Sequence, residues 1–518
     1  MRKIIALLLL AFPLCVLAQR GDVVKGGCTP GLSENDGAMT RGARRSLQPI
    51  HTDWNPQKVY RQPVVLFTFA DKDFSMEHPR ETYDSIFNYP GYNRGSGPGC
   101  VADYFREQSG GMLNIQFDVY GPYKVTQNAK RNANANSDTQ EFGTYAMLDA
   151  TEKWIASDTQ RQHKDYDWYG KGEVTQTIYI YAGYSGNQAY DACYGCIWPN
   201  SSQFSSYLAI TTHDGYLIRN YTCSGEMRYR GNQLYGIGTI CHEFTHCLGL
   251  PDIYPTNRNM GYSMVDEWDL MDGGNYIDSG WCPPNYSGLE RMLMGWQSPI
   301  ELTEPTTITS MKPLSEGGPV YLVRHTNSEY YLLENRQWTG WDALLPGRGL
   351  VVFHVDYDNS SWVSNMLNNN KTHRRYQLVT ADNLDYDAWD AIIGDGDDRA
   401  NGHNLHLSTA AYPWTTDSTD YVNDRLTDTS EPPSLMYNSN SAGSLFLSKA
   451  VTNIRVSDDG LVSFDFMGGT PVNICTDTAK TEETLYDLSG HRVSTPQPGR
   501  LYIVRGNDGT ARKILVHP

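Results

Sequence analysis

The sequence predicts an α/β (α+β) domain, followed by a β-rich domain and a small β module at the C-terminus. Up to about residue 300, strand-like and helix-like segments alternate, which is typical of an α/β layer. After Pro305, β-type segments alternate with turn residues and show little helical period. From about residue 475, two short β-type segments form the tail.

The elements of the α/β part follow from apolar periodicity and from turn residues between the segments. We expect strands at 63–69, 113–121 and 177–184, and helices at 101–109, 142–156 and 236–248. The β-rich part is expected to contain strands within 320–325, 329–338, 349–357, 376–381 and 460–469. The tail segment 500–516 predicts a hairpin that turns at Asn507, Asp508 and Gly509.

Length, charge and the N-terminus restrict the class of protein. A chain of 518 residues is too long for a single hydrophobic core, so more than one domain is expected. A net charge of −17 argues against a nucleic-acid partner. The segment 1–18 has a basic start, an apolar run and small residues before a cleavage point, which predicts a secretory signal peptide. That run is too short to span a membrane, and no later stretch is long enough. We therefore expect a secreted protein with a short prosegment at 19–58.

The stretch "HEFTHCLGLPD" at 242–252 predicts a catalytic metal site. On a helix, His242 and His246 lie within about 40° of each other and one turn apart, so both imidazoles can bind one zinc ion. Glu243 points about 100° away from His242, where it can act as general base on the zinc-bound water. Gly249 ends the helix, and the returning chain lets Asp252 supply a third ligand. Three protein ligands leave the fourth position open for catalysis.

A methionine in a Gly- and Asp-rich turn agrees with this site. Met271 lies 19 residues after Asp252, and metzincins place a methionine turn beneath their metal. The predicted fold of the α/β part is therefore a metzincin-like zinc-protease domain. Glu267 is the competing third ligand, because its separation from His246 suits zinc proteases that use two histidines and a glutamate.

The sequence resembles the secreted immune inhibitor A-type metallopeptidases. The resemblance is carried by "HEFTHCLGLPDIY", "WDLMDGGNY" and "PPNYSGLERMLMGW", with further similar segments between about residues 60 and 467. It implies a zinc endopeptidase made as a zymogen, often with structural calcium. It assigns His242, His246 and Asp252 as zinc ligands, Glu243 as general base and Met271 as the turn methionine. It also suggests Tyr276 as a group that stabilises the oxyanion.

The changes in sequence character divide the chain into a metallopeptidase catalytic domain at 59–300, a β-rich accessory domain at 301–470 and a C-terminal module at 471–518. The tail from about Leu485 resembles the sorting domains that type IX secretion machinery recognises, so that machinery is an expected partner. A small terminal β-module without that role is the alternative.

Three further features are expected to bear on latency, calcium and disulfides. Cys28 in the short prosegment is a candidate latency thiol that binds the zinc, and a disulfide is the alternative. The loop at 166–174 is less acidic than the calcium-like loop of relatives, and 395–398 is another acidic cluster. Cys193 and Cys196 predict a local disulfide framework with Cys223 or Cys100. Cys241 and Cys247 face away from the zinc side of the helix and are expected to pack or to form disulfides.

The predicted function is hydrolysis of peptide bonds in extracellular proteins by a Glu-activated, zinc-bound water, on protein or peptide substrates. Two alternatives stay open. The chain could be a non-catalytic adhesin-like surface protein, or a glutamate-ligated zinc aminopeptidase.

Overall fold

The computed structural model divides the chain into two compact units, Met1–Gly469 and Thr470–Pro518. In the first unit the structure describes residues 50–130, 143–188, 190–256, 265–384, 407–415 and 422–469. In the second it describes four strands, β20 Thr484–Tyr486, β21 Arg492–Val493, β22 Leu501–Arg505 and β23 Ala511–Leu515.

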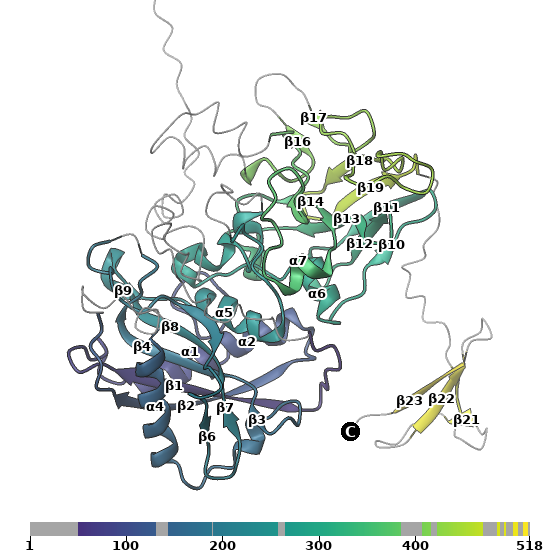
Figure 1. Cartoon of the computed structure of the whole chain (residues 1–518). Coiled ribbons are helices and arrows are strands. Elements are labelled where there is room, and N and C mark those ends of the chain that lie inside the picture. Colours follow the sequence, from purple (N-terminus) through teal and green to yellow (C-terminus); the bar gives the residue numbers. More distant parts are fainter. Residues whose placement is uncertain are drawn as a thin grey trace, which may run out of the picture. The chain divides into compact units, whose positions relative to one another are not determined.

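A six-stranded sheet is the centre of the α/β part (Figure 1). Its order is β2-β1-β4-β8-β5, and β9 also pairs with β8. The strands are β1 Val59–Thr68, β2 Asn114–Lys124, β4 Thr177–Tyr184, β5 Asn200–Gln203, β8 Asn220–Arg228 and β9 Gln233–Leu234. β2, β1, β4 and β8 are parallel, whereas β5 and β9 run antiparallel to β8. The three strands expected from the sequence in this part are confirmed.

Helices cover both faces of this sheet, because successive side chains of a strand point to opposite sides. Val64 and Leu66 of β1 pack in one core with residues of α1 Pro79–Asn88, α2 Val101–Gln108 and α5 Gly238–Leu248. Val65 and Phe67 pack in a second core with α4 Thr144–Ser157. The result is a three-layer arrangement in which α5 lies on the α1 and α2 side.

The described β-rich part contains two larger sheets and the two-stranded sheet of β16 Trp414–Thr415 and β17 Val422–Asn423. The first is five-stranded, with β10 Ile300–Glu301, β12 Val320–Arg324, β13 Glu329–Arg336, β14 Gly349–Asp356 and β15 Tyr376–Leu378 in that order. The second is three-stranded, with β11 Thr306–Met311, β19 Val462–Phe466 and β18 Val451–Val456. The short helices α6 Gly288–Leu293 and α7 Asn359–Val363 flank them. The remaining strands of the first unit are β3 Glu173–Val174, β6 Ile210–Thr211 and β7 Leu217–Ile218.

The five-stranded sheet contributes to two cores at once. Tyr331 and Val352 pack with the three-stranded sheet, while Leu332 and Phe353 pack in the same core as helix α5. One hydrophobic core therefore continues across residue 300, from the active-site helix to the β-rich part.

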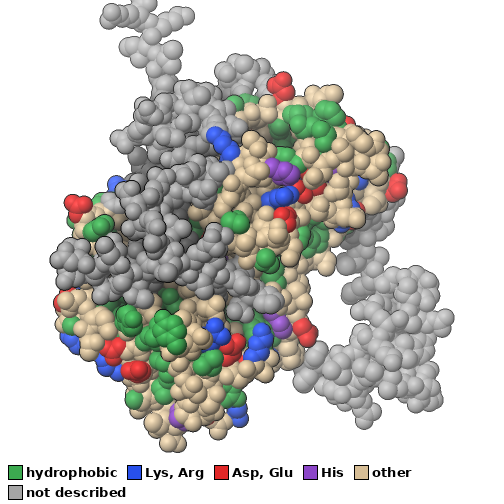
Figure 2. All heavy atoms as spheres, in the orientation of Figure 1, with side chains coloured by type: hydrophobic (Ala, Val, Ile, Leu, Met, Phe, Trp, Pro, Cys, Tyr) green, Lys and Arg blue, Asp and Glu red, His purple; other side chains and the backbone are tan. Residues whose placement is uncertain are grey.

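The mixed α/β fold class is confirmed in its coarse form, with several sheets and few helices. In the second unit, β22 and β23 pair antiparallel, so the expected hairpin forms, and its turn residues 507–509 lie outside the described residues. Within the described residues, no helix combines the length and the apolar character that crossing a membrane requires. Acidic and basic side chains are interspersed on the face of the molecule that Figure 2 shows.

The expected disulfide framework is wrong for the described cysteines. No disulfide joins any of the seven described cysteines, and all seven are buried: Cys100, Cys193, Cys196, Cys223, Cys241, Cys247 and Cys282. Five of these sulfur atoms have polar partners, and those of Cys100 and Cys223 are two examples. The Cys100 thiol caps α2 through Asp103, and the Cys223 sulfur accepts a hydrogen bond from Asn200 at 3.2 Å. Their side chains are thus part of the packed interior rather than of a covalent cross-link.

Candidate metal centre

Helix α5 is buried along its whole length, which is unusual for a helix that carries two histidines and a glutamate. Its start packs against the backbone of the 3₁₀ segment η6 Gly273–Gly280. A Cβ atom on Gly238 would lie 2.1 Å from the carbonyl oxygen of Asn275, so only glycine permits this approach. The helix ends at Gly249, whose φ of 108° confirms the predicted glycine stop.

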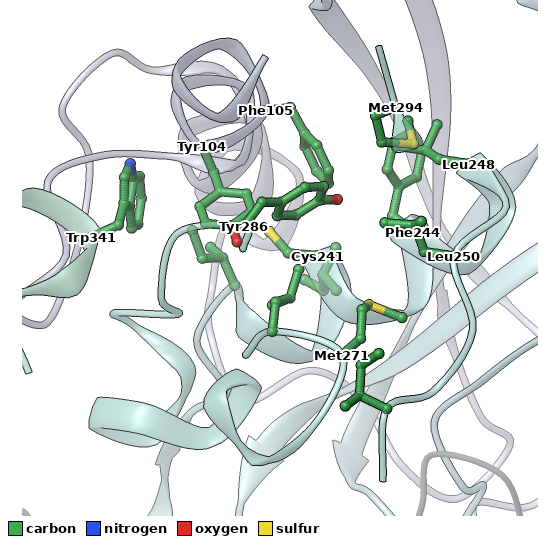
Figure 3. Packing of buried hydrophobic residues seen from close by; sticks show 14 of the residues in the cluster. Tyr104, Phe105, Cys241, Phe244, Leu248, Leu250, Met271, Tyr286, Met294 and Trp341 are labelled. Atoms are coloured by element: carbon green, nitrogen blue, oxygen red, sulfur yellow. The ribbon is translucent and has the colours of Figure 1, made fainter. Parts of the chain in front are cut away.

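Figure 3 shows how apolar side chains hold this helix. Phe244 of α5 packs edge-to-face on Phe105 of α2, with ring centroids 5.0 Å apart. On the next residue, the Thr245 hydroxyl is hydrogen-bonded to the Tyr286 hydroxyl. Aromatic pairs of this kind stabilise by about 0.5–1.5 kcal/mol beyond their buried area. The helix is therefore fixed against rotation, which fixes the direction of its histidines.

The structure brings His242, His246 and Asp252 together at the end of α5. The Nε2 atoms of both histidines lie 3.2 Å from the same oxygen, Oδ1 of Asp252. Zinc bonds of about 2.0–2.1 Å at tetrahedral angles place ligand atoms roughly 3.3 Å apart. All three residues are buried, and their ligand atoms lie within 4.8 Å of one another. Their spacing thus suits a single ion between them.

The tautomers of the two imidazoles point to the same conclusion. Nδ1 of His242 lies 2.9 Å from the carbonyl oxygen of Leu270, and Nδ1 of His246 lies 2.8 Å from that of Leu250. A carbonyl only accepts, so each Nδ1 carries the proton and, in the neutral ring, each Nε2 presents a lone pair. Two lone pairs and a carboxylate oxygen then face one another, which is unfavourable unless a cation lies between them. Carbonyl-bound imidazoles are the usual arrangement of metal-ligating histidines.

Asp252 is suited to remain ionised in this buried position. Burial raises the pKa of its carboxyl, but when the Nε2 atoms carry protons instead of a metal ion, the charge of His246 and hydrogen bonds from both imidazoles lower that pKa by more, to well below its usual range. A metal ion at the same edge of the rings would supply the same positive charge. The second carboxylate oxygen, Oδ2, accepts a hydrogen bond from Asn365 at 2.6 Å.

Glu243 and Met271 are both buried, and their roles as general base and turn methionine stay predictions. Glu243 is buried on α5 directly after His242, on the side of Cys223, whose thiol pKa it helps to raise after the larger effect of burial. Met271 is fully buried, and its carbonyl accepts from the backbone of Ile253 at 2.9 Å. It directly follows Leu270, whose carbonyl oxygen lies 2.9 Å from Nδ1 of His242, and its side chain belongs to the packed apolar cluster of Figure 3.

The other predicted site residues that the structure describes are not part of the group formed by His242, His246 and Asp252. Glu267 lies on the 3₁₀ turn η5 Asp266–Trp268 and does not join the group of His242, His246 and Asp252. The segment around it is not α-helical, as the sequence indicated. Tyr276 is half-buried on η6, beside the start of α5. Cys28 and the acidic cluster 395–398 lie outside the described residues. In the loop 166–174, Asp167 accepts from the backbone of Lys171 and Gly172, which uses its carboxylate for the turn itself.

A second group of possible ligands lies elsewhere, at His163, His213 and Asp214. Asp214 accepts from both the backbone N–H of His163 and its ring Nδ1, at 2.7 and 2.8 Å. His213 and Asp214 are exposed. The contacts of this carboxylate are those of a cap that orders the turn at His163, so this group has a structural explanation that the buried group lacks.

Sequence reasoning missed three groups that orient the candidate ligands: the carbonyls of Leu250 and Leu270, and the side chain of Asn365. Carbonyls carry no signal in the residue type. Asn365 is 113 residues away from Asp252, in a segment rich in Asn and Ser that is typical of a loop.

Comparison with known proteins agrees with this centre. Residues 211–291 match the family model described as the immune inhibitor A peptidase M6 catalytic domain. The matched segment includes α5, Asp252 and Met271 and covers less than half of the chain. No curated protein matches the chain. The family match, together with the candidate His/Asp metal-binding group, supports a metallopeptidase with an immune inhibitor A-like catalytic domain.

Proposed function

We propose that the chain is a secreted, zinc-dependent endopeptidase of the metzincin type that hydrolyses peptide bonds of extracellular proteins. His242, His246 and Asp252 hold the ion in this proposal. The observation that carries it is the convergence of two Nε2 atoms on one carboxylate oxygen, at 3.2 Å each, while both Nδ1 atoms are bound to carbonyls. The family match supports the class of reaction.

The chemistry divides between the ion and the chain. Zinc, when bound, polarises the scissile carbonyl and lowers the pKa of the attacking water. Glu243 accepts the proton that this water loses and returns it to the leaving amine. Its position one residue after His242 on a fixed helix keeps the carboxylate beside the ligands without making it one of them. The Leu250 and Leu270 carbonyls keep both imidazoles in the ligand tautomer throughout.

The edge of the main sheet is the proposed place for an extended substrate. β5 ends the order of the described sheet, runs antiparallel to β8, and lies against α5, where the Ser201 hydroxyl is 3.3 Å from the Cys247 sulfur. A peptide that adds to such an edge gains backbone hydrogen bonds before any side-chain specificity.

The test combines zinc content with cleavage of casein. Glu243→Gln is expected to retain zinc and to lose at least about 100-fold in kcat, because general-base catalysis contributes 10²–10⁴-fold. Asp252→Ala is expected to lose zinc, whereas Glu267→Ala, the matched control for the competing ligand, is expected to keep both zinc and activity. Undiminished cleavage by Glu243→Gln would contradict the mechanism. Zinc loss in Glu267→Ala but not in Asp252→Ala would identify Glu267 as the third ligand in place of Asp252.

The two alternative functions give different results in the same assay. An adhesin-like protein would show no chelator-sensitive cleavage at all. An aminopeptidase would cleave peptides with a free N-terminus but not N-acetylated ones, whereas the proposed endopeptidase cleaves both.

Secretion and latency are also part of the proposal. Residues 1–18 act as the signal, 19–58 as the prosegment and the C-terminal module as a sorting signal, with Cys28 as the latency thiol and structural calcium as a further cofactor. N-terminal sequencing of the exported protein tests the first two assignments, and deletion of 471–518 tests the third.

A further inference from the structure

A loop of the β-rich part binds the carboxylate of the candidate third ligand. Asn365 follows α7, 113 residues after Asp252 in the chain. Its amide Nδ2 donates to Oδ2 of Asp252 at 2.6 Å, and its Oδ1 accepts from the backbone N–H of Asp252 at 2.7 Å. One side chain therefore holds both the backbone and the side chain of the same residue.

This double contact determines which oxygen faces the histidines. With Oδ2 occupied by the Asn365 amide, Oδ1 is the oxygen left 3.2 Å from both Nε2 atoms. Rotation of the carboxylate about its Cβ–Cγ bond would break this hydrogen bond between the Asn365 amide and a charged acceptor. The contact thus favours a carboxylate that binds through one oxygen only.

The loop itself is fixed to the turn that carries Asp252. The Thr256 hydroxyl donates to the Asn365 carbonyl at 2.9 Å, and Asn368 donates to the Ile253 carbonyl at 2.8 Å. Asn365 has a φ of 55°, a left-handed conformation that asparagine tolerates better than other residues with a side chain. Both the residue type and the backbone at this position suit the contact with Asp252.

We propose that Asn365 is a positioning residue that orients the Asp252 carboxylate for metal binding, so that the β-rich part completes the metal centre. This inference rests on the proposed function of Asp252 as a ligand. It assigns to Asn365 no contact with substrate or ion. Residues that orient a ligand in this way typically change metal affinity by 10–100-fold when they are lost.

The test measures zinc affinity by competition with a chelator in the full chain. Asn365→Gly keeps the left-handed backbone and removes the side chain, and is expected to weaken zinc binding by about 10–100-fold. Asn365→Asp keeps the size of the side chain but replaces the donor to Oδ2 by an acceptor. Its zinc affinity is therefore also expected to be lower than that of the wild type. Asn369→Ala is the matched control, because Asn369 lies in the same loop and donates to Thr256 rather than to Asp252. Its zinc affinity should stay within about twofold of the wild type.

A spectroscopic readout separates positioning from a general structural effect. With cobalt in place of zinc, the visible absorption band of Asn365→Gly should shift or lose intensity, while that of Asn369→Ala should not. Melting of the metal-free proteins measures the structural cost of each variant independently. If Asn365→Gly does not fold, the zinc affinity and the cobalt band of Asn365→Asp are compared with those of Asn369→Ala instead.

The outcomes distinguish this inference from the proposed function. If Asp252→Ala weakens zinc binding but Asn365→Gly binds zinc within twofold of the wild type, only the positioning role fails. Restored affinity and an unchanged cobalt band in Asn365→Asp would also overturn it. If Asp252→Ala itself binds zinc normally, the ligand assignment fails, and the inference fails with it.

Discussion

A buried ion pair of the β-rich part also contacts the segment before Met271, and its loss should cost more than that of any surface pair. Arg336 of β13 donates two hydrogen bonds to Asp342, at 2.8 and 2.7 Å, and both side chains are fully buried. Its guanidinium also lies 3.5 Å from the carbonyl of Trp268 and 3.3 Å from that of Asn285. The cluster thus connects the β-sheet with two loops below α5.

The expected magnitude follows from what Arg336→Met leaves behind. Asp342 would remain buried and would keep the hydrogen bond from the backbone N–H of Asn285, at 2.9 Å. Glu334, whose pKa burial raises to about 7 while Arg336 opposes the rise, would lose a nearby positive charge. Removing one partner of a buried ion pair costs about 3–5 kcal/mol, because the other charge is left without compensation. We expect a loss of this size in the free energy of unfolding.

The chain contains a matched control. Arg324 of β12 makes the same two-bond contact with Glu301, at 2.9 Å for both bonds, but its side chains are 34% and 37% exposed. Pairs of this kind are worth about 0–1 kcal/mol. Guanidinium unfolding followed by tryptophan fluorescence measures both variants at pH 7, and Trp268 and Trp341 lie beside the buried cluster. If Arg336→Met costs no more than Arg324→Met, the reasoning from burial is refuted.

Three further predictions concern pH, the helix stop and the metal. Burial raises the pKa of Glu329, but hydrogen bonds from His354, Tyr437 and Asn438 outweigh it and lower the pKa to about 2. Glu329 should therefore stabilise the fold by about 3 kcal/mol above pH 4.5, and the stability difference from Glu329→Gln should vanish as the pH falls toward 2. A difference that grows on acidification would contradict this. Gly249→Ala places a side chain at a φ of 108° and should cost more than about 1 kcal/mol in chemical unfolding and weaken zinc binding; an unchanged midpoint would show that the turn tolerates it. A chelator should lower the melting temperature of the wild type but not that of His246→Ala, since only bound metal adds stability; equal shifts would place the ion elsewhere.

The α/β fold could be predicted where strands are apolar, and not where a strand is polar. Residues 63–67 of β1 and most of β4 are apolar, so their sequence alone indicates buried parallel strands. β8 is equally buried, but its sequence "NYTCSGEMR" has no apolar alternation. Its polar groups are satisfied by distant segments, since Glu226 accepts from Ser75 and from the backbone of Gly183. Such partners are brought together by the fold and leave no local pattern.

The candidate site could be predicted to the extent that one helix and its following turn define it. His242, His246 and Asp252 lie within eleven residues, so helix geometry and a glycine stop are enough to bring them together. The groups that orient them come from elsewhere, through the carbonyl of Leu270 and the side chain of Asn365. A motif thus predicts which residues could bind a metal, whereas the tertiary structure determines which atom of each residue faces the ion.

The site also does not follow the division of the chain by composition. The change in character near residue 300 separates a helix-containing part from a β-rich part, yet the core that holds α5 contains Leu332 and Phe353 of the β-rich sheet. Arg336 reaches the loop before Met271, and Asn365 reaches Asp252. The first contact comes from β13 and the second from the loop after α7, at separations of 68 and 113 residues along the chain. The β-rich part therefore contacts both the segment before Met271 and the candidate third ligand.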